Sequence, residues 1–86
     1  WTVSQYRFSG NFKLIAEFRN EATDAKVCIN PYRSYNDVPG LEDCHRVVLI
    51  SPDDEVEEIA KGLELEYVED AEQTALDAMK EYSEES

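Results

Sequence analysis

Apolar and polar residues alternate along two early stretches of the chain. Within residues 12–18 every second residue is apolar, and only Ile15 interrupts the pattern, while residues 25–29 repeat it after a short polar connection. A period of two residues is typical of strands with one buried face. Together with residues 6–8, these stretches predict three strands in an antiparallel meander, because the connections are too short for crossovers.

Residues 47–68 predict a strand, a helix and a second strand. Residues 47–50 are all apolar, as in a central strand buried on both faces. Ser51 and Pro52 fit the N-cap and the first position of a helix. The apolar residues that follow the helical spacing i, i+3, i+4, i+7 are Val56, Ile59, Ala60 and Leu63. Residues 63–67 alternate again, so a right-handed crossover is expected to place this strand parallel to residues 47–50.

A second helix is predicted near the end of the chain. Asp70 and Gln73 form a capping-box pattern. The apolar stripe of this helix consists of Ala71, Ala75, Ala78, Met79 and Tyr82. Residues 83–86 are expected to fray. Residues 1–86 are thus predicted to form a single α+β domain of two layers, with a mixed five-stranded sheet, the order βββ, long loop, βαβα, and two helices on one face.

Residues 31–44 form the one long irregular segment, with two prolines and a glycine. Two interpretations remain open. The segment folds back as a lid over the sheet face that the helices leave uncovered, or Tyr32, Arg33 and Tyr35 contact a ligand, since long loops in small domains often carry function.

The charge balance narrows the possible partners. Eight Lys and Arg residues against twenty Asp and Glu residues give a net charge of −12. Direct nucleic-acid binding and anionic membranes are disfavoured, because both need a cationic protein surface. Cations and basic protein surfaces are the natural partners. High net charge also keeps a small protein soluble and monomeric whatever its function. No signal peptide and no apolar run of membrane length is visible, so a soluble, cytoplasmic monomer is expected.

The residues that carry nucleophilic chemistry are sparse. His45 is the only histidine, and Cys44 beside it projects to the opposite side of an extended chain. Cys28 has no orienting third group, and one His with two Cys leaves a zinc site incomplete. We therefore expect a non-enzymatic protein with two reduced thiols and an ordinary, solvated histidine at a strand edge. An enzyme that uses His45 with the long loop is a weaker alternative.

Carboxylates are the main candidates for function. In the predicted first helix, Asp54, Glu57 and Glu58 occupy i, i+3 and i+4 and share one surface. The full set of candidate metal ligands is Asp53, Asp54, Glu57, Glu58, Glu69 and Asp70. Such an open site predicts weak Ca²⁺ or Mg²⁺ binding, with Kd of roughly 10⁻⁴–10⁻³ M. Favourable interaction with the helix dipole also accounts for the acids of the first turn without any ion.

An acidic interaction module is the alternative function. Such a protein, or an inhibitor of the nucleic-acid-mimic type, occupies a basic surface of its partner through many spread charges. The two functions make different demands on the fold. Ion binding needs carboxylates that converge at one point, whereas a binding module needs one extended acidic face.

Overall fold

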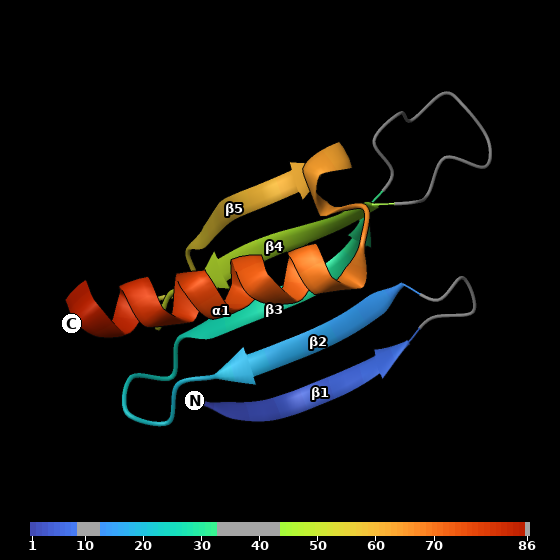
Figure 1. Ribbon diagram of the computed structural model, residues 1–86. Coiled ribbons are helices and arrows are strands. Elements are labelled where there is room, and N and C mark those ends of the chain that lie inside the picture. Colours follow the sequence, from blue (N-terminus) through green and yellow to red (C-terminus); the bar gives the residue numbers. More distant parts are fainter. Residues whose placement is uncertain (9–12, 33–43, 86) are drawn as a thin grey trace.

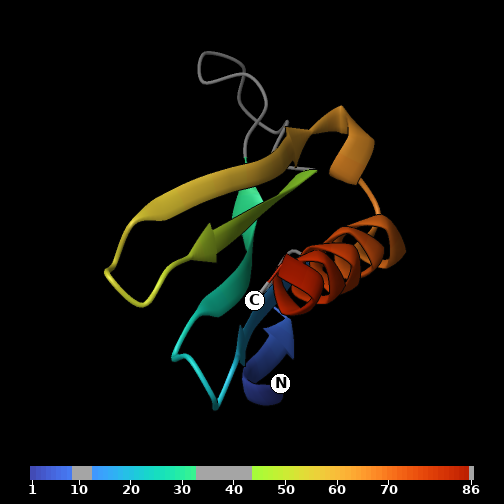
Figure 2. The same cartoon turned by 90° about the vertical axis from the view of Figure 1, so that its left-hand side faces the viewer.

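A computed structural model describes residues 1–8, 13–32 and 44–85 of the chain, apart from the side chains of residues 63 and 85. The elements are β1 (Thr2–Phe8), β2 (Leu14–Arg19), β3 (Lys26–Tyr32), β4 (Cys44–Ile50), β5 (Val56–Gly62), a short 3₁₀ helix η1 (Leu63–Leu65) and α1 (Val68–Glu85). The strands form one sheet in the order β1-β2-β3-β4-β5, and every neighbouring pair is antiparallel (Figure 1). Helix α1 lies across one face of this sheet (Figure 2).

The core lies between α1 and the sheet. Alternate residues of β2, β3 and β4 meet small residues of the helix, and η1 adds one leucine. The buried residues of this core are Leu14, Ala16, Val27, Ile29, Val47, Leu65, Ala71, Ala75, Ala78 and Met79. The predicted meander of three strands is confirmed. The predicted stripe of the last helix is confirmed for Ala71, Ala75, Ala78 and Met79, whereas Tyr82 is only partly buried. The three alanines let the helix approach the sheet closely.

The predicted mixed sheet with two helices is wrong. Over residues 1–8, 13–32 and 44–85 the order is βββββα, with a wholly antiparallel sheet and one α-helix. Residues 56–62, predicted as a helix, form β5 beside β4, and residues 63–67, predicted as a strand, contain the single turn η1. No crossover connects β4 and β5, since a tight hairpin joins them.

The Ser-Pro signature that suggested a helix cap is a hairpin turn. The Asp54 N–H donates to the Ser51 carbonyl oxygen at 2.9 Å, and the Glu55 N–H donates to the Ser51 hydroxyl at 3.1 Å. Pro52 follows Ser51, the position that proline favours in a type I turn, and Asp54 adopts a left-handed conformation with φ of 65°. A type I turn followed by a left-handed residue is a common three-residue hairpin loop.

The apolar residues of β5 are spaced as in a helix, and the strand accommodates this spacing through an irregular register with β4. Ala60 lies opposite Val47 and Glu58 lies opposite Val48, so Ile59 is an extra residue in the ladder. Val56 and Ile59, expected in a buried stripe, are 59% and 38% exposed. The sheet offers a partner strand along the whole of β4, whereas a seven-residue helix has little stability of its own, so strand pairing determines the structure here.

Some predictions fall outside the described residues. They include the turn at residues 9–11, the start of the second strand at Phe12, and most of the long segment, with Arg33 and Tyr35. Pro31 and Tyr32 belong to β3, and Cys44 begins β4. In the described part of the chain, no helix is both long and apolar enough to cross a membrane.

Candidate functional site

The six candidate ligands lie in three separate places. Asp53 and Asp54 are in the β4–β5 turn, Glu57 and Glu58 are in β5, and Glu69 and Asp70 are in the first turn of α1. The β4–β5 turn and the first turn of α1 are at opposite ends of the molecule (Figure 1). Within the described residues no group of three or more His, Cys, Asp or Glu side chains could hold a metal ion.

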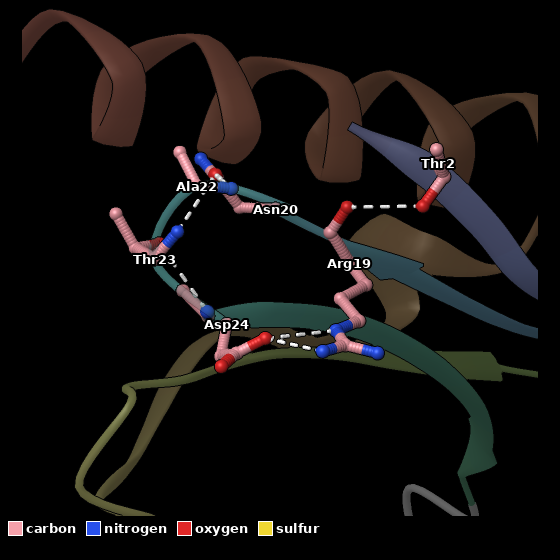
Figure 3. Close-up of polar contacts among 7 residues, drawn as sticks. Thr2, Arg19, Asn20, Ala22, Thr23 and Asp24 are labelled. Atoms are coloured by element: carbon pink, nitrogen blue, oxygen red, sulfur yellow. Dashed lines mark hydrogen bonds and ion pairs between the residues drawn. The ribbon is translucent and has the colours of Figure 1, made fainter.

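Asp54 lies in a hollow that also contains cations. The hollow is formed where the β2–β3 and β4–β5 loops meet, and its lining residues are Arg19, Asp24, Lys26, Ile50, Ser51, Pro52 and Asp54. Figure 3 shows the Arg19 guanidinium directed at the Asp24 carboxylate, with Nε 3.1 Å from Oδ1. The Asn20 side chain holds this loop by accepting from the Ala22 N–H at 2.9 Å. Two positive side chains in the same hollow oppose the binding of a metal cation beside Asp54.

Glu57 and Glu58 point to opposite sides of the sheet because they are neighbours in a strand. The Glu58 carboxylate pairs with Arg46 Nε at 3.0 Å and with Lys61 Nζ at 3.4 Å, and it raises the pKa of Lys61. Glu57 lies on the helix side, in a shallow groove that Glu81 of α1 also lines. The predicted convergence of these two residues with Asp54 depended on a helix and is wrong.

Helix α1 carries the largest concentration of carboxylates. Residues 68–85 contain seven acidic residues and one basic residue, Lys80, which gives −6 of the total charge of −12. The exposed carboxylates of α1, here called the acidic helix surface, are Glu69, Asp70, Asp77, Glu81 and Glu84. From Glu69 to Glu84 this surface extends about 22 Å along the helix axis.

The last turn of the helix carries acids where the backbone disfavours them. Glu69 and Asp70 in the first turn complement the positive end of the helix dipole, but no basic residue lies in the last turn, which contains Glu84. A carboxylate near the negative end of a helix costs stability, by about 0.3–1 kcal/mol at an exposed position. The acidity of α1 therefore extends beyond what helix stability requires.

Cations collect on the other face of the sheet. Core residues Phe18, Val27 and Val47 face the helix, so their strand neighbours face away from it. The basic residues on this uncovered side are Arg7, Arg19, Lys26, Arg46 and Lys61, five of the eight in the chain. The molecule is thus polarised, with an acidic helix layer on one side and a sheet face richer in cations on the other.

His45 is buried, not solvated as predicted. Its side chain has no exposed surface, and it lies between two backbone groups. The Leu14 N–H donates to Nε2 at 3.1 Å, while Nδ1 lies 2.8 Å from the Leu65 carbonyl oxygen. Because Nε2 accepts and the carbonyl can only accept, the imidazole is neutral and carries its proton on Nδ1. Burial lowers the pKa of His45, and the positive charge of Lys13 lowers it further.

This arrangement leaves His45 without the geometry of a catalytic base. Both ring nitrogens are engaged by the backbone, and the ring faces the helix side, whereas Cys28 lies on the opposite face, across from Val48. The two cysteines form no disulfide, and burial raises the pKa of the Cys28 thiol. From its position near the start of β4, His45 instead connects the start of β2 with η1 through its hydrogen bonds to the backbone of Leu14 and Leu65.

Sequence reasoning missed most of the acidic helix surface. The carboxylates of the predicted metal site include Glu69 and Asp70 but not Asp77, Glu81 and Glu84, which are spaced along the helix and form no local cluster in the sequence. Charge counted over each predicted helix would have found them. Comparisons of the chain with models of known protein families, with curated proteins and with solved structures found no match.

Proposed function

We propose that this chain is a non-enzymatic binding module that docks its acidic helix surface on a basic surface of a partner protein. The observation that carries the proposal is the concentration of charge, −6 within residues 68–85, on one element and toward one side of the molecule. The acids continue to the end of α1, where the helix dipole opposes them. A property that costs stability is often retained for function.

The spacing of the carboxylates favours a broad contact with a protein surface and not the binding of a single metal ion. Metal ligands lie about 2.3–2.6 Å from a bound Ca²⁺ ion, whereas the acidic helix surface spreads over roughly 22 Å. Spread charges accelerate encounter with a basic surface and orient the complex. The cations on the far face of the sheet direct a basic partner toward the helix side.

A pair of triple variants tests the location of the binding surface. Glu69→Gln, Glu81→Gln and Glu84→Gln together remove three charges from α1. We expect them to weaken binding of an oligolysine peptide about tenfold, or ~0.5 kcal/mol for each charge. The measurement is isothermal titration calorimetry at low and at moderate salt. Wild-type affinity should fall as salt rises, because exposed charges are screened.

The matched control removes three exposed acids elsewhere. Glu21→Gln, Asp53→Asn and Glu55→Gln leave the same net charge of −9, but none of them lies on α1. We expect this control to bind within about threefold of wild type. Equal weakening by the two variants would show that net charge alone governs binding and would refute the proposed surface. Thermal unfolding should show the α1 variant close to wild type in stability, because losing Glu69 at the positive end of the helix dipole offsets the gain from removing Glu84 at the negative end.

Weak binding of Ca²⁺ or Mg²⁺ stays a prediction from the sequence. A titration of the ¹⁵N-labelled chain with either ion, followed by ¹H–¹⁵N shifts, checks it. Local shifts confined to Asp53 and Asp54, or to Glu69 and Asp70, at millimolar ion would support a cation site. Uniform small shifts along α1 would indicate only diffuse screening.

A further inference from the structure

The two edges of the sheet differ in character. On β5, Glu57, Glu58 and Lys61 place charges along the edge strand, a common way to prevent pairing with another chain. On β1, Arg7 is the only charged side chain, and the chain contains no carboxylate before Glu17. Every residue of β1 is exposed, and among the described residues no element lies beside its outer edge.

An apolar patch runs along β1 on the helix side. Val3 lies opposite Phe18, Tyr6 opposite Ala16 and Phe8 opposite Leu14, so all three share the face that the core occupies. They are nevertheless 59%, 48% and 52% exposed, because α1 packs mainly against β3 and β4 and covers little of β1. We call four exposed large side chains at this edge the edge patch: Val3, Tyr6, Phe8 and Leu76.

Contacts between β1 and α1 hold the edge patch in place. The Tyr6 hydroxyl donates to the Glu72 carboxylate, and the Trp1 indole N–H donates to the Ser83 hydroxyl at 3.0 Å. Val3 and Leu76 lie between these two contacts along their elements. The Phe8 ring packs edge-on against Tyr6, with centroids 6.0 Å apart. The patch is thus a prearranged apolar surface beside an unpaired strand, and such surfaces commonly mark interaction sites.

We infer that β1 pairs with β1 of a second copy of this chain, joining two sheets into one antiparallel sheet across a twofold axis. A symmetric contact places the same surface on both sides, so the edge patch of one copy meets that of the other. A register centred on Tyr6 sets Arg7 opposite Gln5 of the second copy and keeps the two arginines apart. In a chain with a net charge of −12, β1 carries no carboxylate of its own, and Glu72 of α1 is hydrogen-bonded to Tyr6, so two copies can approach along β1 with little repulsion.

The acidic helices stay far apart in this dimer. With a twofold axis perpendicular to the sheet, both α1 helices lie on the same face, each at least as far from the axis as β3. Five strand spacings of about 4.8 Å separate the two β3 strands, or roughly 24 Å. This distance exceeds the Debye length of about 8 Å at physiological salt, so repulsion between the helices is largely screened. At about 0.01 M salt the Debye length is about 30 Å and the repulsion is felt, so dimer formation should strengthen as salt rises from this level toward about 0.15 M, opposite to the effect on binding to a basic partner.

Two valines provide a matched test. Val3 on β1 and Val56 on β5 are both 59% exposed, so lysine at either position should leave the fold intact. Sedimentation equilibrium of the wild-type chain is expected to show a dimer with Kd of about 100 μM or tighter, at the weak end of specific interfaces. We expect Val3→Lys to weaken the dimer at least about tenfold, while Val56→Lys, with the same net charge of −11, leaves it unchanged.

Several experimental outcomes would contradict the proposed dimer. A wild-type chain that remains monomeric at about 1 mM would overturn it. So would a dimer that Val3→Lys leaves intact, or one that both lysine variants disrupt equally. Amide hydrogen exchange adds a second measurement, since the amides of β1 that point away from β2, every second one along the strand, should become more protected as protein concentration increases. A dimer without this change would place the contact elsewhere and refute pairing through β1.

Discussion

Replacing His45 with Leu is expected to lower the free energy of unfolding by about 2–4 kcal/mol. Leucine fits the volume but cannot accept from the Leu14 N–H or donate to the Leu65 carbonyl. Two backbone groups beside a wholly buried position would then lack partners, and each costs roughly 1–3 kcal/mol when it stays unsatisfied. Urea unfolding followed by circular dichroism measures the change.

Glutamine at the same position is the matched control. Its side-chain amide offers one acceptor and two donors, so His45→Gln can restore one or both backbone contacts. We expect His45→Gln to recover about half of the stability that His45→Leu loses. If the leucine variant unfolds within about 0.5 kcal/mol of wild type, the hydrogen bonds of His45 contribute little and the packing of η1 against β4 must have another cause.

Mild acid is expected to destabilise the fold through the same residue. The pKa of His45 is lowered in the folded state from its ordinary value of 6.5, because burial disfavours the imidazolium. Below pH 6.5 the unfolded chain binds this proton and the folded chain does not, so stability falls as pH drops toward the folded pKa. The loss is at most about 1.4 kcal/mol per pH unit, and the full contribution of the neutral ring is present above pH 6.5.

The comparison between wild type and His45→Gln isolates this effect. Carboxylates also titrate in acid, and in a chain with twenty of them protonation relieves repulsion and acts in the opposite direction. The change in unfolding free energy from pH 7.5 to pH 5.5 should be more negative, or less positive, for wild type than for His45→Gln, because only wild type loses the contribution of the neutral imidazole. Equal differences in the two proteins would show that His45 does not control the response to acid.

The parts of the fold that sequence predicted correctly have a clear local signal. Alternation in residues 12–18 and 25–29 matches β2 and β3, and the alanine stripe of α1 matches its buried side. The failure at residues 51–62 has a specific physical cause. Ser51 and Pro52 are favoured both at a helix start and in a type I turn. Because Ile59 is an extra residue in the β5 ladder, Val56, Ile59 and Ala60 have the i, i+3, i+4 spacing that is typical of a helix.

The candidate site was predictable only in part. The acidic character of the chain is evident from its composition, but the fold decides whether the carboxylates converge at one point. Residues 56–62 form a strand and not the predicted helix, so Asp54, Glu57 and Glu58 do not share one surface. The role of His45 was not predictable, because its partners Leu14 and Leu65 are backbone groups distant in sequence. One of these partners, Leu65, lies in η1, a single turn of three residues that is too short to show a periodic sequence pattern.

The meander order of the strands has a consequence for how the chain folds. Each strand pairs only with its neighbours in the sequence, so the sheet can grow one hairpin at a time with little loss of loop entropy. Helix α1 contacts β3, β4 and β5, and its buried side is mostly alanine, which gives it little to bury until those strands have assembled. We therefore expect the helix to dock last, so that the most acidic part of the chain joins the core only after the sheet has formed.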